Sequence, residues 1–86
     1  MNETIESQRK RMHIRAWRRG TKEMDLILGG YADSYLAGMD ADALAAFDAL
    51  LAQDDHDLYQ WVTGQVAPPA RFATLVGRLA DRQAGR

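Results

Sequence analysis

One short segment, Arg19-Gly20-Thr21-Lys22-Glu23, places side chains that suit recognition of another molecule close together. Arginine is a bidentate hydrogen-bond donor and glutamate is an acceptor. The glycine between them has no side chain to keep another surface away from the backbone. Because the segment lies where two expected helices meet, it predicts an exposed binding corner. The alternative is that Arg19 and Glu23 only pair with each other, which is worth about 0–1 kcal/mol at an exposed turn.

Side chains that catalyse reactions or bind metals are scarce in the remaining sequence. Cysteine is absent, and Ser7 and Ser34 have no histidine at a suggestive spacing. His13 and His56 are interpreted as solvated surface residues. The run Asp54-Asp55-His56-Asp57 fans out around a helix start, where capping explains the carboxylates more simply than a metal ion does. We therefore predict that the protein is not an enzyme, binds no metal and holds no cofactor stably by itself.

The formal charge changes sign twice along the chain. It is +4 over residues 1–23, −8 over residues 24–67 and +3 over residues 68–86. This pattern indicates either an electrostatic docking surface or charge balance between packed helices. A basic first helix also leaves open a small nucleic-acid-binding or regulatory module. Because the acidic helices would repel phosphate, we expect no nucleic-acid partner.

The elements that must position the corner are predicted to be helical throughout. Apolar residues recur at helical spacing, and no run alternates with the period of a strand. We expect an all-α, compact bundle of five short helices in a single domain over residues 1–86, with residues 1–6 and 82–86 as loose ends. The helices are expected near residues 7–19, 21–38, 40–51, 54–64 and 68–80. The predicted core contains Ile27, Leu28, Tyr31, Leu44, Phe47, Leu51, Leu58, Trp61, Phe72, Leu75 and Val76.

The length and the first residues of the chain limit where in the cell we expect the protein. The 86 residues hold no apolar run near the length of about 20 that spans a bilayer, so no membrane insertion is expected. The N-terminal residues lack the apolar stretch of a secretory signal. We therefore expect a cytoplasmic protein.

The corner and two further segments resemble the succinate dehydrogenase assembly factor family, the SdhE-type FAD assembly or flavinylation factors. Arg19-Gly20-Thr21-Lys22-Glu23 matches the R-G-x-x-E motif of that family, and Arg15, Trp17 and Asp25 extend the match. The segment from Asp54 to Trp61 is similar to its D-D-x-D-L-x-x-W segment. The main departure is an arginine- and alanine-rich C-terminus.

The resemblance implies a five-helix fold and a role in assembly. Such a factor binds the flavoprotein subunit of succinate dehydrogenase and, in some bacteria, that of fumarate reductase. It promotes covalent attachment of FAD to a histidine of that subunit, which itself holds the FAD. By resemblance, the partner-binding residues are Arg19, Gly20 and Glu23, together with Arg15, Trp17, Arg18 and Asp25. The free protein is expected to be a monomer.

Overall fold

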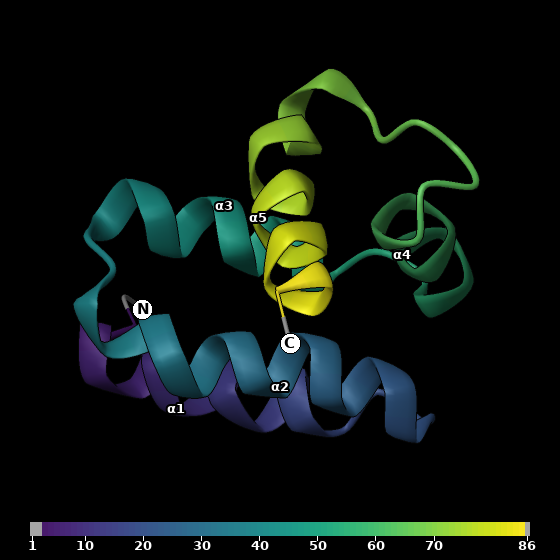
Figure 1. Ribbon diagram of the computed structural model, residues 1–86. Coiled ribbons are helices and arrows are strands. Elements are labelled where there is room, and N and C mark those ends of the chain that lie inside the picture. The colour runs from purple at the N-terminus through teal and green to yellow at the C-terminus, as the bar shows by residue number, and fades with distance from the viewer. Residues whose placement is uncertain (1–2, 86) are drawn as a thin grey trace.

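The computed structural model describes residues 3–85, and within them every regular element is helical (Figure 1). The five helices confirm the predicted all-α class. They are α1 (Ile5–Trp17), α2 (Lys22–Tyr35), α3 (Ala41–Leu51), α4 (Asp55–Val62) and α5 (Ala73–Ala84), with short 3-10 turns η1 (Leu36–Gly38) and η2 (Ala70–Phe72).

The helices form two layers. In Figure 1, α1 and α2 lie side by side along the lower edge, and α3 and α5 pack above them. The shorter α4 lies over the N-terminal end of α2 and packs against α5. The connection between α1 and α2 therefore projects at one end of the molecule, close to α4. No helix in the described residues is long and apolar enough to cross a membrane.

Local sequence explains where the helices begin. Each of the first four helices follows a threonine or aspartate whose side chain accepts a hydrogen bond from a backbone N–H of the first turn. Such N-caps satisfy one of the donors that have no partner within the helix. The capping residues are Thr4, Thr21, Asp40 and Asp54. The capping interpretation of the aspartate run at Asp54 is therefore confirmed.

All five helices contribute to one core. The largest fully buried side chains include Phe47 of α3, Met12 of α1 and Leu58 of α4. The predicted core is confirmed, with Trp61 and Leu75 half-buried at its edge. Tyr35, which lies four residues after Tyr31 at helical spacing, is exposed. The chain turns into η1 after Tyr35, and Leu36 takes the buried position.

The ends of the helical region differ from the expectation of loose termini at residues 1–6 and 82–86. Helix α1 already begins at Ile5, because Thr4 caps it and the Glu3 carboxylate pairs with Arg11. Helix α5 continues to Ala84. Residues 1, 2 and 86 lie outside the described residues. The fifth helix also starts later than Pro68-Pro69 predicts, because Pro69 is extended and a 3-10 turn precedes α5.

Candidate functional site

The corner between α1 and α2 is shaped by the backbone of Gly20. This residue has a φ of +109°, in a region that side chains with a Cβ rarely adopt. Gly20 is exposed, and a Cβ placed on it would meet no atom within 4 Å. The glycine therefore serves the turn itself, in addition to leaving the backbone accessible.

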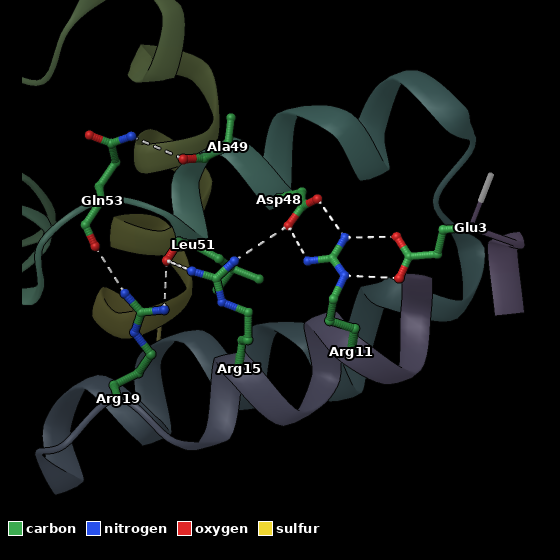
Figure 2. A network of polar contacts seen from close by, with 8 residues as sticks. All are labelled: Glu3, Arg11, Arg15, Arg19, Asp48, Ala49, Leu51 and Gln53. Atoms are coloured by element: carbon green, nitrogen blue, oxygen red, sulfur yellow. Dashed lines mark hydrogen bonds and ion pairs between the residues drawn. The ribbon is translucent and has the colours of Figure 1, made fainter. Parts of the chain in front are cut away.

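Arg19 does not point out of the corner, as the sequence led us to expect, but into the protein. Its side chain is only 9% exposed, and its Nε donates to Asp55 Oδ1 at 2.8 Å. The remaining guanidinium nitrogens donate to the carbonyl oxygens of Leu51 at 2.8 Å and Gln53 at 3.0 Å (Figure 2). The last carbonyls of a helix lack donors within it, so Arg19 caps the end of α3 while it pairs with the start of α4. The expectation of an exposed arginine donor was therefore wrong.

Arg19 is the last of three arginines that extend from the α1 side toward α3. Arg11, Arg15 and Arg19 are spaced four residues apart, and all three reach the C-terminal half of α3 or the residues just after it (Figure 2). Arg11 forms two hydrogen bonds with Asp48, at 2.7 and 2.9 Å, and two with Glu3. The spacing of four is visible in the sequence, but this row of arginines was not predicted from it.

The row changes how the charge pattern is interpreted. The hydrogen bonds from Arg11 hold the pKa of Asp48 below its usual range, and Asp48, followed by Glu3, raises the pKa of Arg11. Part of the basic N-terminal charge is thus balanced by the acidic middle of the chain. Of the two interpretations offered for the alternating charge, internal balance accounts for Arg11, Arg15 and Arg19.

Trp17 also serves the packing of the helices. Its indole contacts α2 at Gly29, where an added Cβ would overlap three atoms of the ring. Its Nε1 donates to Asp33 Oδ1 at 3.1 Å, and His13 Nε2 lies 2.6 Å from the same oxygen. These hydrogen bonds, first from His13 and then from Trp17, lower the pKa of Asp33. Gly29 is therefore needed for the close approach of α1 and α2.

The remaining predicted residues divide between the interior and the surface of the corner. The carboxylate of Asp25 accepts the backbone N–H of Arg19 at 2.6 Å, which stabilises the turn. Arg15 is partly exposed and reaches the Leu51 carbonyl at 3.4 Å. Arg18, Gly20 and Glu23 face solvent. Of the seven predicted residues, Arg15 is thus exposed along with these three, whereas Trp17, Arg19 and Asp25 are partly buried and hydrogen-bonded within the fold.

Glu23 occupies a distinctive place in the first turn of α2. In the described part of the chain its carboxylate has no ion pair, and Arg19 pairs with Asp55 instead. The alternative of an Arg19–Glu23 pair across the turn is therefore wrong. Glu23 lines two surface hollows of about 460 and 440 Å³. It is the exposed acceptor that the sequence predicted.

Within residues 3–85, no group of three or more His, Cys, Asp or Glu side chains is placed to share a metal ion. The aspartates around His56 act in other ways: Asp54 caps α4, and Asp55 pairs with Arg19.

Comparison with known proteins identifies relatives over most of the chain. A protein-family model described as "Flavinator of succinate dehydrogenase" matches residues 10–83. A protein of Candida glabrata named "Succinate dehydrogenase assembly factor 2, mitochondrial" is 41% identical over 63 residues, which are 73% of this chain and 41% of the relative. The protein of the same name from Drosophila grimshawi is 33% identical over 80 residues, 91% of this chain and 54% of the relative.

The relatives are longer than this chain. A third protein of that name, from Saccharomyces cerevisiae, is 39% identical over 62 residues, which are 72% of this chain and 38% of the relative. The chain thus spans between about two fifths and about half of the length of these relatives. Since the family match extends from the middle of α1 to the last turn of α5, the chain belongs to the succinate dehydrogenase assembly factor family, the flavinators of succinate dehydrogenase.

Proposed function

We propose that this protein binds the flavoprotein subunit of succinate dehydrogenase and promotes covalent attachment of FAD to a histidine of that subunit. Family membership supports this proposal, and the single structural observation that carries it is the corner at Gly20 and Glu23. The corner offers an accessible backbone and a carboxylate that no side chain of the described residues neutralises. These are the features that a complementary protein surface would use.

The proposed action requires no catalytic group on this chain. Formation of the covalent bond needs the histidine and the flavin held close together in a reactive orientation, and both belong to the partner. A protein that binds only the competent arrangement of the partner shifts its population toward that arrangement. FAD is then held by the flavoprotein, and this chain acts as an assembly factor instead of an enzyme.

Rigidity of the corner supports such a role. Arg19 joins the corner to the end of α3 and the start of α4, and Asp25 holds the backbone of Arg19 from the other side. A preorganised surface loses little conformational entropy on binding. We propose that Arg19 and Asp25 keep Gly20 and Glu23 in place, while Arg18, Gly20 and Glu23 touch the partner.

The nucleic-acid alternative is disfavoured by where the arginines point. Arg11, Arg15 and Arg19 would supply much of the charge that contacts phosphate, but they face α3. A cytoplasmic location, a monomeric free state and the flavoprotein of fumarate reductase as a second client in some bacteria belong to the same proposal.

The test compares two conservative variants in a strain that lacks the chromosomal copy of the gene. Glu23→Gln removes the charge at the corner, whereas Glu6→Gln removes a similarly exposed charge from the first turn of α1. In-gel fluorescence of the denatured flavoprotein subunit measures covalently bound flavin. We expect loss of flavin in the deletion strain, rescue by the wild type and Glu6→Gln, and weaker rescue by Glu23→Gln. Full flavinylation without this protein would refute the proposed function.

A further inference from the structure

Two hollows on the surface adjoin each other, because Glu23 lines both of them. The first is lined by α2, α4 and the end of α5, and the second lies between the start of α2 and the start of α4. Glu23 and Tyr59 line both hollows, and Thr21 connects the second to the corner. We call this surface the Glu23 groove. The residues that line it come from the N-terminal half of α2, from α4 and from the C-terminal end of α5, and Figure 1 shows how these helices are arranged.

Apolar side chains line much of the groove although it is open to solvent. Leu26 is 46% exposed and Tyr59 is 41% exposed, so each presents a large apolar area to water. The buried residues Ile27 and Val62 continue the lining inward. Large exposed apolar residues that gather in one hollow are typical of an interaction site, whereas scattered ones are not.

The charge of the groove indicates what it accepts. Among residues 3–85, no lysine or arginine lines either hollow. The carboxylates that line them belong to Glu23, which has no ion pair within these residues, and to Asp55, which pairs with Arg19. A hollow elsewhere on the surface, beside Tyr35, is lined by Arg71 and Arg78. An anionic group such as the pyrophosphate of FAD would therefore meet a carboxylate in the Glu23 groove, whereas a cation would be attracted.

We propose that the Glu23 groove binds a segment of the flavoprotein subunit that carries a lysine or arginine beside an apolar side chain. The cation pairs with Glu23, and the apolar side chain packs on Leu26 and Tyr59. This inference rests on the proposed function and extends the interface from the corner to α4 and α5. The flavoprotein is the occupant because the groove begins at Thr21, within the corner that faces the partner.

Binding of purified components tests the groove directly. The ligand is the flavoprotein subunit purified from the deletion strain, and the dissociation constant is measured by fluorescence anisotropy of this labelled protein. Leu26→Lys removes the apolar contact and places a positive charge where the cation of the partner would bind, and Ile14→Lys makes the same change at a residue of α1 that is 51% exposed. We expect Leu26→Lys to weaken binding about tenfold or more and Ile14→Lys to leave it within about twofold.

Two further variants keep the inference open to refutation if Leu26→Lys folds poorly. Tyr59→Ser removes the other exposed apolar group, and Glu23→Gln should weaken binding more at low salt than at high salt, because screening weakens the ion pair. If the wild type binds while Leu26→Lys and Tyr59→Ser bind equally well, the groove is not part of the interface and the proposed function stands. If the wild type does not bind at all, both the proposed function and the inference about the groove are refuted.

Sedimentation tests a second occupant of the groove. If the wild type sediments as a dimer, and Tyr59→Ser makes it a monomer with unchanged affinity for the flavoprotein, the groove binds a second copy of this chain and the inference is overturned.

Discussion

Replacing Arg19 with alanine should markedly lower the melting temperature of this protein. This effect is not expected from the sequence alone, which assigns Arg19 to a binding motif. The guanidinium donates to Asp55, to the Leu51 carbonyl and to the Gln53 carbonyl. Its removal leaves three acceptors without their donor at a place that is largely closed to water. A buried polar group without a partner costs about 1–3 kcal/mol.

The expected loss can be bounded from the exposure of the groups involved. Removal of one partner from a fully buried ion pair costs about 3–5 kcal/mol. Asp55 and Gln53 are only half-buried, so water replaces part of the lost hydrogen bonding. We therefore expect a loss of about 3 kcal/mol in the free energy of unfolding, near the lower end of that range. For a domain of this size the melting temperature should fall by roughly 12–24 °C.

Thermal unfolding followed by circular dichroism, with Arg15→Ala as the matched control, measures this effect. Arg15 lies one turn earlier in the same row, but it is 44% exposed and its contacts at 3.4 and 3.9 Å are long. Its loss should cost about 0–1 kcal/mol. Arg19→Lys should fall between the two, since an ammonium group cannot present the planar set of donors that reaches all three acceptors. Melting temperatures of Arg19→Ala and Arg15→Ala within about 2 °C of each other would refute the structural role of Arg19.

Three further outcomes are expected. Gly29→Ala forces a methyl group into the indole of Trp17 and should destabilise the protein by about 1–3 kcal/mol, whereas Gly77→Ala, with open space at its Cβ, should be neutral or stabilising in thermal melts. Arg11→Gln should raise the pKa of Asp48 toward its usual range in a carboxyl-carbon NMR titration. Folding lowers the pKa of Asp48, so this carboxylate stabilises the protein at pH values above its unfolded pKa of about 3.9. That stabilisation disappears as the pH falls through the lower, folded pKa. In Arg11→Gln, the free energy of unfolding should therefore decrease less over this acidic range. Phe47→Ala should cost roughly 3–5 kcal/mol in urea unfolding, because Phe47 is fully buried, and a change below about 1 kcal/mol would contradict the assigned core.

The backbone conformation at Gly20 complicates a mutational test of this residue. An interface role alone implies that a bulky replacement would leave folding intact. The φ of +109° means that any side chain at Gly20 also strains the turn. Loss of function in such a variant would therefore not distinguish a blocked interface from a strained backbone. Glu23→Gln avoids this ambiguity, because Glu23 lies in an ordinary helical turn with its side chain in solvent.

Features that depend on near neighbours in the chain were predictable from the sequence. The helix starts at Thr21, Asp40 and Asp54 follow from capping between residues two or three apart, and the core follows from apolar residues at helical spacing. The resemblance rested on short segments of consecutive residues in the same way. Each of these sequence patterns involves residues that lie within one or two helical turns of each other, so it can be recognised without the tertiary structure.

The direction of Arg19 was decided only by the tertiary structure. Asp55 is 36 residues away from it in sequence, and the carbonyls of Leu51 and Gln53 are backbone groups that residue types do not reveal. A residue in a turn has no helical periodicity to show which way its side chain points. Only the packing of α3 and α4 beside the corner provides the acceptors that draw Arg19 inward and leave Gly20 and Glu23 at the surface. The sequence determined which residues gather at the corner, and the packing of distant helices determined which of them support the fold and which are free to meet a partner.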